Sequence, residues 1–482
     1  MEKRNKITFF AASDILLYAL AMVTLVSISL GRVTRWDLLQ QIAMSDRFIA
    51  SGNFYPEIEQ VPNAGVSIYF PGNALIASIL SILGVETHLI ESMHLIACVV
   101  LLLFIFMQYR IAKIYLDYGE TFRDFAKISI LIALVPCSYW LSYSAEFKPD
   151  TIAFVFGLCG LVTYSAASRQ GSVFLAVLGG LFVATGVMFK QQYLLFVAMT
   201  VAMSIFVQPN TWKWFVPSAV FFSALLLAII LDDTAIYWSI QVVSDDGTLP
   251  FAQLLITQLP TAHKLTVSAL VLVLLNVHKQ FLFSALQHFK KIIKTPNVWF
   301  LPVFASALLA VGSAAKDGGN AGNVQLGLVL LLPLWAVTLT AVSTKKTISL
   351  LAWLAIISNL PEARSSLDNY KDARALHTAI STLELENSTN ILIDSNAYYI
   401  VRPLREDHRI IDYWSLALKE NSSTNPDVYA AKVLQNIDID LAVLRHSSII
   451  ENYFNARDDY QIYYRGGEFV IYLKTPNENA KT

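Results

Sequence analysis

Long apolar runs recur through the first three quarters of the chain, and they constrain its fold more than any other feature. A helix needs about 20 mostly apolar residues to cross roughly 30 Å of hydrocarbon. On that scale the sequence predicts eleven membrane spans, near residues 8–30, 87–107, 128–143, 151–168, 172–189, 192–208, 214–231, 264–278, 298–315, 324–342 and 347–360. We interpret the first run as a retained anchor, because it is too long for a signal-peptide core and no clear small-residue cleavage site follows it.

The charged residues are concentrated after the last of these runs. Of the 122 residues in 361–482, 31 are charged, whereas only 40 of the first 360 are. The C-terminal share is typical of a soluble domain, for which about 25% is usual. With 55% hydrophobic residues overall, the composition excludes an ordinary cytosolic enzyme, a disordered protein and a nucleic-acid-binding protein. It predicts a transmembrane domain, 1–360, followed by a small α/β domain, 361–482.

The basic residues predict how the spans are oriented. If the N-terminus is cytoplasmic, 15 of the lysines and arginines before residue 361 lie on the cytoplasmic side and seven lie at the outer side. Such an excess on the cytoplasmic side is usual in membrane proteins. Eleven spans then leave residues 361–482 outside. The sequence therefore predicts a multi-pass protein of the cytoplasmic (inner) membrane with a cytoplasmic N-terminus and an extracytoplasmic C-terminal domain.

Segments outside the spans have predictable structure of their own. Residues 72–84 are apolar but too short to span, so we expect a helix on the outer membrane surface, within a long first outer loop, 31–86. Long ordered loops are usually functional. In the C-terminal domain we predict strands at 390–394 and 440–445, helices near 370–385 and 426–436, and a hairpin over 460–472 that turns at Gly466-Gly467.

One carboxylate directly follows the first span. Asp37 comes after Trp36 in the first outer loop, and the pattern predicts a helix that begins here and ends within Gly52–Pro56. A carboxylate held at the membrane face can deprotonate a hydroxyl group if its pKa and geometry suit. The alternative is that Asp37 caps the N-terminus of the helix. Position alone slightly favours the cap.

Further ionisable residues lie at the predicted outer ends of later spans. The start of the fourth span is surrounded by Glu146, Lys148 and Asp150. Charged groups at this depth are costly unless they serve a function or are paired with opposite charges. Lys148 can contact a phosphate and Asp150 can bind a metal or orient a base, but an Asp cap explains the pattern equally well. Lys190 and Lys316 can each hold the phosphate of an anionic lipid. Snorkelling to the headgroups is the alternative, and it is the usual outcome for a lone lysine at a helix end.

Together these segments resemble the C-type (GT-C) superfamily of polyprenyl-phosphate-sugar glycosyltransferases. The nearest branch is that of the bacterial aminoarabinose transferase, the protein O-mannosyltransferases and the Rgt-like galacturonosyltransferases. The resemblance covers essentially the whole chain and rests on the order of short motifs and on their side of the membrane. The motifs are Trp36-Asp37 with Gly52-Asn-Phe-Tyr-Pro56, Tyr69-Phe-Pro71-Gly, Lys148-Pro-Asp150, Phe189-Lys190-Gln191, the turn from Lys316 to Asn320, and the terminal α/β domain. Relatives often have an acidic pair at Asp37 and an arginine at Lys148.

The resemblance implies a polytopic α-helical membrane enzyme that transfers a sugar, with inversion, from undecaprenyl or a similar polyprenyl phosphate. The acceptor would be a cell-envelope glycan or lipid, with a protein less favoured. Asp37 would act as the base, and Asp150 with Glu146 would orient the site or a divalent cation, the one cofactor that the resemblance allows. The substrate-binding residues would be Lys148, Lys190, Gln191, Lys316, Asn320 and Tyr69.

Two other classes of membrane protein remain as alternatives. A transporter or lipid flippase should contain internal repeats and ionisable groups near the membrane midplane, whereas here the ionisable residues lie mostly at span ends. An O-antigen polymerase or ligase usually relies on a large outer loop with arginines, and the loop from Asp232 to His263 has none. The sequence therefore favours the transferase.

Overall fold

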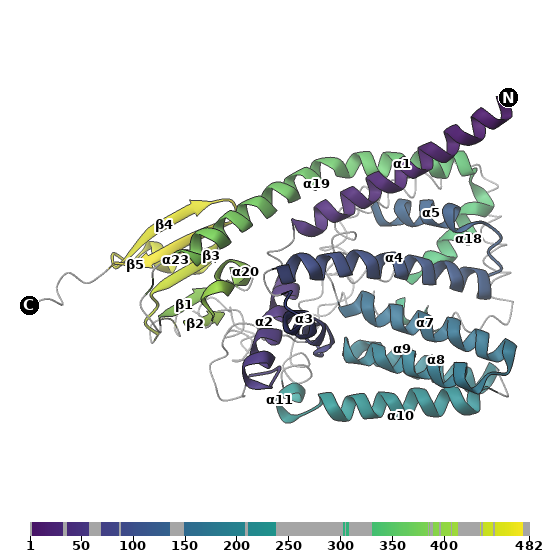
Figure 1. Ribbon diagram of the computed structural model, residues 1–482, viewed down its shortest axis with the longest axis horizontal. Helices are drawn as coiled ribbons and strands as arrows, with labels where there is room; N and C mark the ends of the chain where they lie inside the picture. The colour runs from purple at the N-terminus through teal and green to yellow at the C-terminus, as the bar shows by residue number, and fades with distance from the viewer. Residues whose placement is uncertain are drawn as a thin grey trace, which may run out of the picture. The chain divides into compact units, whose positions relative to one another are not determined.

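The computed structural model describes the chain as two compact units (Figure 1). It describes residues 2–31, 36–56, 69–85, 88–134, 149–207, 211–237, 302–303, 305–307, 330–383, 385, 389–394, 397–405, 407–412, 434, 437–446 and 449–475. Unit 1 comprises Met1–Ser29, Met93–Ile230 and Gly247–Arg364, and unit 2 comprises Leu30–Ser92, Leu231–Asp246 and Ser365–Thr482. The domain boundary at residue 361 that composition suggests stays a prediction.

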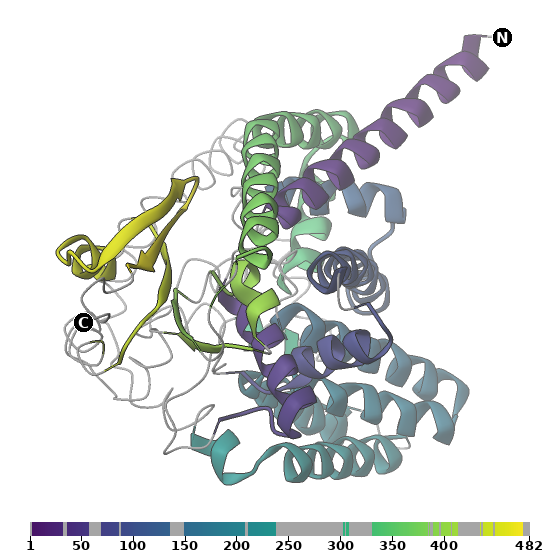
Figure 2. The same cartoon turned by 60° about the vertical axis from the view of Figure 1, so that its left-hand side comes forward.

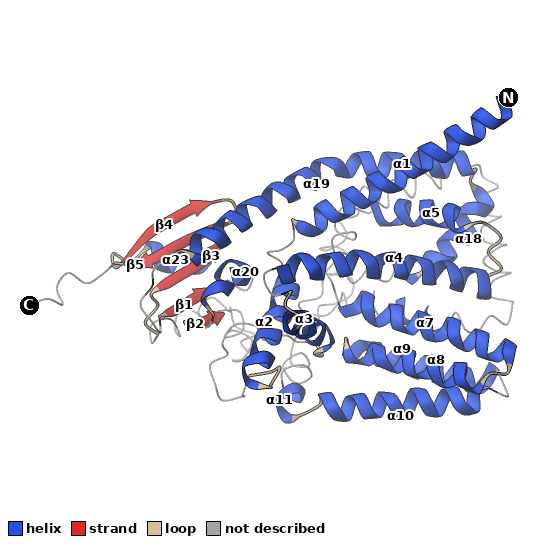
Figure 3. Ribbon diagram, in the orientation of Figure 1, coloured by secondary structure: helices blue, strands red, loops and turns tan. Residues whose placement is uncertain are grey.

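The described part of unit 1 is helical (Figure 3). The helices that lie wholly or mostly in it are α1 (Glu2–Leu30), α4 (Leu89–Tyr115), α5 (Phe122–Leu134), α7 (Pro149–Gln170), α8 (Val173–Thr185), α9 (Leu194–Val207), α10 (Trp212–Ile230), α18 (Leu332–Val342) and α19 (Lys345–Ser381). Among the described residues, four helical segments are long and apolar enough to cross a membrane, namely Ser13–Leu30, Leu89–Tyr115, Pro149–Gln170 and Trp212–Ile230. Each coincides with a predicted span, so the multi-span helical class is confirmed.

The count of eleven spans is not confirmed and stays a prediction. α8 (Val173–Thr185) is shorter than the span expected at 172–189. The spans expected at 128–143, 192–208 and 324–342 each extend into residues outside the described part of the chain. The span expected at 347–360 lies within α19, which continues through Pro361 to Ser381. Residues 264–278 lie outside the described part of the chain, as do most of 298–315.

Glycines bring α7, α8 and α10 into close contact, and the three helices lie side by side in Figure 1. A Cβ atom on Gly160 of α7 would lie 2.4 Å from a methyl carbon of Val183 on α8. On the other side of α8, a Cβ atom on Gly180 would lie 2.7 Å from the Cβ of Ser218 on α10. Small residues allow such close approach between helices in membranes. This packing fixes the start of α7 relative to the chain that follows α8.

The C-terminal part of unit 2 contains a five-stranded sheet, drawn in green and yellow in Figure 2. Its strands are β1 (Asn390–Ile393), β2 (Arg409–Asp412), β3 (Leu441–Arg445), β4 (Tyr460–Gly466) and β5 (Phe469–Lys474), in the order β2-β1-β3-β5-β4. β1 pairs in parallel with β2 and β3, whereas β5 is antiparallel to β3 and β4. The predicted strands and hairpin are confirmed, and Gly467 has the positive φ of +58° that the hairpin turn needs.

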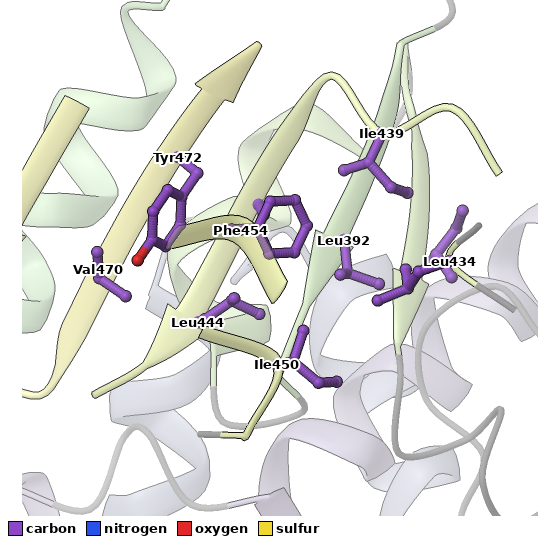
Figure 4. Packing of buried hydrophobic residues seen from close by; sticks show 10 residues of the cluster. Leu392, Leu434, Ile439, Leu444, Ile450, Phe454, Val470 and Tyr472 are labelled. Atoms are coloured by element: carbon purple, nitrogen blue, oxygen red, sulfur yellow. The ribbon is translucent and has the colours of Figure 1, made fainter. Parts of the chain in front are cut away.

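Apolar side chains from the sheet and one short helix form the core of this domain. Phe454 of α23 (Ile449–Asn455) packs on Tyr472 of β5 with ring centroids 5.4 Å apart, and Leu392 and Leu444 complete the layer (Figure 4). The Tyr472 hydroxyl donates to Asn455 Oδ1 at 2.7 Å, so its polar end is satisfied. Burial of this one cluster explains why α23 covers the sheet.

Two helices of the segment predicted to form the first outer loop, 31–86, belong to unit 2. They are α2 (Trp36–Ser51), which ends at Gly52 with a φ of +79°, and α3 (Gly72–Ile82). Met44 of α2, Tyr55 and Ala74 of α3 form a buried cluster together with Ala235. Both predicted helices are therefore confirmed. The placement of α3 on the membrane surface stays a prediction.

Candidate active site

Asp37 is the second residue of α2. An N-cap residue precedes the first helical residue, so the backbone places Asp37 inside the first turn instead of at the cap. A carboxylate in the first turn of a helix is favoured by the helix dipole. The capping alternative is thereby weakened, and the role of Asp37 as a base stays a prediction.

Buried polar side chains follow Asp37 along α2. Gln40 is 2% exposed, and neither its amide nitrogen nor its amide oxygen has a hydrogen-bond partner among the described residues. One turn further, Ser45 accepts a hydrogen bond of 3.0 Å from Ser78 of α3. Tyr69, predicted to bind substrate, lies in the same unit, and its carbonyl accepts a 2.6 Å hydrogen bond from the Tyr55 hydroxyl. Ser45 therefore faces α3. Gln40 was not predicted from the sequence as a site residue.

Asp150 and Lys190 form a buried ion pair in unit 1. Lys190 Nζ donates to Asp150 Oδ1, and the two residues are 5% and 3% exposed. No donor among the described residues reaches the second carboxylate oxygen, Oδ2. Because Lys190 is buried, snorkelling to lipid headgroups does not describe it. The sequence placed both residues at outer span ends without predicting that they pair.

Local structure holds each member of this pair. Asp150 follows Pro149, the first residue of α7, where proline and a carboxylate both suit a helix start. Lys190 has an extended backbone (φ −152°, ψ 129°) between two 3-10 turns, Gly186–Met188 and Gln191–Tyr193. Irregular backbone in a membrane protein is tolerated where protein buries it or where it lines a cavity. Asp150 is therefore a first-turn residue rather than an N-cap, and Lys190 lies at a break between helices.

An aromatic side chain fills the space beside this break. The hydroxyl of Tyr193 would lie 2.5 Å from a Cβ atom on Gly157 of α7, and its ring would lie 2.5 Å from one on Gly186. Tyr193 also stacks on Phe196 at 5.1 Å between ring centroids. Since the two glycines make room for one ring, the segment that contains Lys190 and Gln191 is packed tightly against α7.

A second buried ionic cluster, which the sequence did not predict, lies in unit 2. Arg402 donates to both oxygens of Asp46 of α2, through Nη2 at 2.8 Å and Nε at 2.9 Å. The Tyr398 hydroxyl adds a hydrogen bond of 2.9 Å to Asp46, and Arg405 Nε lies 3.7 Å away. Burial raises the pKa of Tyr398 well above its ordinary value, and the Asp46 carboxylate raises it further. Residues 356 positions apart give no local signal of such a contact.

The remaining predicted site residues lie outside the described part of the chain. They are Glu146, Lys148, Lys316 and Asn320. Among the described residues no group of three His, Cys, Asp or Glu side chains is placed to hold a metal ion. Asp150, the described candidate ligand, already pairs with a lysine, whose positive charge opposes a cation at the same carboxylate. The described residues therefore do not fit a metal, and the predicted divalent cation stays a prediction.

Comparisons with known proteins bear on the fold. No protein-family model matches the chain, and no curated protein matches its sequence. Among solved structures, it is similar to ArnT from Cupriavidus metallidurans bound to undecaprenyl phosphate, with a TM-score of 0.55 and 11% identity over 96% of this chain and 98% of that one. ArnT in the apo state gives a TM-score of 0.51 at 12% identity, covering 98% of each chain. The Archaeoglobus fulgidus oligosaccharyltransferase gives 0.49 at 12% identity, over 89% of this chain and 69% of that one.

The similarity to ArnT extends over nearly the whole of both chains, including the helices and the C-terminal sheet domain. At this level of identity it establishes the fold. The chain has the fold of ArnT, which the sequence resemblance predicted.

Proposed function

We propose that the protein is a membrane glycosyltransferase that moves a sugar from a polyprenyl-phosphate carrier to a cell-envelope glycan or lipid. The observation that carries the proposal is the fold similarity over the full length of ArnT, in a structure that binds undecaprenyl phosphate. A buried lysine that pairs with a carboxylate at a helix break supplies a positive charge that can neutralise a phosphate.

The proposed reaction is a single displacement at the anomeric carbon of the sugar. The acceptor hydroxyl oxygen forms the new bond to this carbon, and Asp37 takes the proton of the hydroxyl group. The bond between the anomeric carbon and the phosphate oxygen breaks, and the polyprenyl phosphate leaves with the electron pair. Attack opposite to the leaving group inverts the anomeric configuration. The position of Asp37 directly after the first predicted span supports its role as the base.

Lys190 is proposed to stabilise the departing phosphate. The phosphate gains one negative charge as the glycosidic bond breaks, and a fixed cation in a dry environment stabilises such charge strongly. The ion pair between Lys190 and Asp150 holds the ammonium group in place before substrate arrives. Asp150 therefore acts as an orienting residue for Lys190. The other proposed substrate-binding residues are Tyr69, Lys148, Gln191, Lys316 and Asn320. Glu146 remains a proposed partner of Asp150.

Binding of the lipid product provides the experiment. Undecaprenyl phosphate should raise the thermal stability of the purified protein, by about 2.7 kcal/mol at a hundredfold excess over its Kd. Undecaprenol has the same chain without the phosphate and should stabilise much less. Thermal unfolding in detergent, followed across a titration of each lipid, measures the difference. Equal effects of the two lipids would contradict recognition of the phosphate.

The proposed site requires the C-terminal domain to lie outside the cytoplasmic membrane. The asymmetry of basic residues supports this orientation. A periplasm-specific reporter fused after Lys474 should be active, and a cytoplasm-specific reporter at the same position should be silent. The opposite pattern would overturn the orientation, and with it the outer-face reaction.

A further inference from the structure

The contacts of Asp46 connect the first outer loop to the C-terminal α/β domain within unit 2. We name Asp46, Tyr398 and Arg402 the Asp46 cluster. Asp46 belongs to α2, whereas the other two belong to the adjoining turns α20 (Tyr398–Val401) and η7 (Arg402–Leu404). Three hydrogen bonds of 2.8 to 2.9 Å join them. The side chains of Asp46 and Arg402 are each 8% exposed, so the contact is nearly dry.

The hydrogen bonds of the Asp46 cluster require one specific geometry of the side chains. A guanidinium that donates to both oxygens of a carboxylate fixes the two groups in one plane and at one distance. Buried ions are costly when they lose their partner, so the cluster favours a single arrangement of α2 against α20. The Tyr398 hydroxyl adds a third donor. Together these contacts restrict rotation and sliding of α2.

Both sides of the Asp46 cluster are themselves held in place. On the α2 side, Arg47 donates to the Phe54 carbonyl at 3.1 Å, and Phe48 stacks on Phe54 at 4.1 Å between centroids. On the other side, the Tyr399 carbonyl makes a hydrogen bond of 2.7 Å with His377 of α19. The cluster therefore connects two elements, α2 and α20, that other contacts also hold in place.

Asp37 lies on the same helix, nine residues before Asp46. At 1.5 Å per residue the two positions are separated by roughly 13 Å along the axis. A helix of this length transmits a tilt or a shift to its first turn. Misplacing a catalytic group by about 1 Å can reduce a rate by about 10²-fold.

We infer that Asp46, Arg402 and Tyr398 are positioning residues that set the orientation of α2, and with it the place of Asp37, by attaching this helix to the C-terminal α/β domain. The inference rests on the proposed function for the catalytic meaning of Asp37. The attachment itself can be tested without any activity. The attachment gives the C-terminal domain a part in the reaction, although none of the three residues is proposed to contact the substrate.

The experiment compares graded variants of the cluster with a matched control. Asp46→Asn removes the charge, Arg402→Lys keeps a charge but cannot donate to both oxygens, and Tyr398→Phe removes one hydrogen bond only. The control is Asp459→Asn. Arg457 also donates to both oxygens of Asp459, but this pair is 37% exposed and joins residues two apart in the chain. Each variant is purified as the full chain and its folded fraction is measured by gel filtration.

Hydrogen exchange gives the first measurement. Amides in the first half of α2, over residues 36–43, should exchange about tenfold faster in Asp46→Asn than in the wild type, since local opening becomes easier. Tyr398→Phe and Arg402→Lys should give smaller increases, and Asp459→Asn should give none in α2. Unchanged exchange of α2 in folded Asp46→Asn and Arg402→Lys protein would overturn the inference, whether or not the enzyme is active.

Kinetics gives the second measurement. Per folded molecule, Asp46→Asn should lower kcat by about 10- to 100-fold with little change in KM for the lipid donor. Arg402→Lys should fall between this variant and the wild type. A purely structural cluster would lower the folded fraction and leave kcat of the folded protein unchanged, which would overturn the positioning role. If α2 exchanges faster in Asp46→Asn but the wild type transfers no sugar from any donor, the attachment is upheld and the proposed function is refuted.

Discussion

Replacing Asp37 with Asn is expected to lower transferase turnover by about 10²–10⁴-fold while the protein still inserts, folds and binds the lipid donor. Asparagine has nearly the same volume and still forms hydrogen bonds, but it cannot take a proton from the acceptor hydroxyl. The change therefore removes the proposed proton acceptor and leaves the volume and the hydrogen bonding of the side chain nearly unchanged. Turnover should be measured with purified protein at saturating donor and acceptor, and donor affinity should be measured separately.

The matched control for this prediction is Asp368→Asn. Asp368 is an exposed carboxylate on α19 that pairs with Lys371 at 3.2 Å. An exposed pair of this kind contributes little to stability, so the variant should behave like the wild type. If Asp37→Asn also retained wild-type turnover, Asp37 would not be the base.

The second large effect is expected at the Asp150–Lys190 pair. Asp150→Asn leaves a buried ammonium without its carboxylate, and Lys190→Gln leaves a buried carboxylate without its ammonium. Removing one partner of a buried ion pair costs about 3–5 kcal/mol of stability. The double variant removes both charges and should recover much of that stability. Thermal unfolding of the three variants in one detergent measures the pattern.

Activity separates a functional pair from a structural one. If Lys190 stabilises the departing phosphate, the double variant should remain inactive although its stability has recovered. Loss of a contact made in the transition state lowers kcat and kcat/KM together, whereas loss of a uniform binding contact raises KM for the donor. Lys213→Gln, an exposed lysine at the start of α10, is the control and should be unaffected. Recovery of activity together with stability would show that the pair only supports the fold.

The sequence was most informative where local patterns decide structure. The apolar runs predicted the helices α1, α4, α7 and α10, because a span must be continuous and apolar. The strand-like run over 460–472 with Gly466-Gly467 at its turn predicted the hairpin of β4 and β5. β2 was missed because it is only four residues long, Arg409–Asp412, and two of the four are charged. Its position depends on pairing with β1, which no local pattern encodes.

The site was predicted less completely, because its contacts join distant parts of the chain. Asp150 and Lys190 were each predicted as site residues, but their pairing depends on how α7 packs against the turn after α8. The contact between Asp46 and Arg402 depends on the folding of a whole domain between them. A single sequence gives ionisable residues and their side of the membrane. It does not give their partners.

The central claim is that a sugar leaves a polyprenyl phosphate and appears on an acceptor. The most direct measurement follows both products of the purified protein together, using undecaprenyl-phosphate sugars of known anomeric configuration and an envelope glycolipid as acceptor. Mass spectrometry quantifies undecaprenyl phosphate and the glycosylated acceptor, and NMR assigns the new glycosidic bond. We expect one equivalent of undecaprenyl phosphate per sugar transferred, with inverted anomeric configuration. Retention of configuration would contradict the single displacement, and movement of the intact lipid across the membrane without bond cleavage would contradict the claim itself.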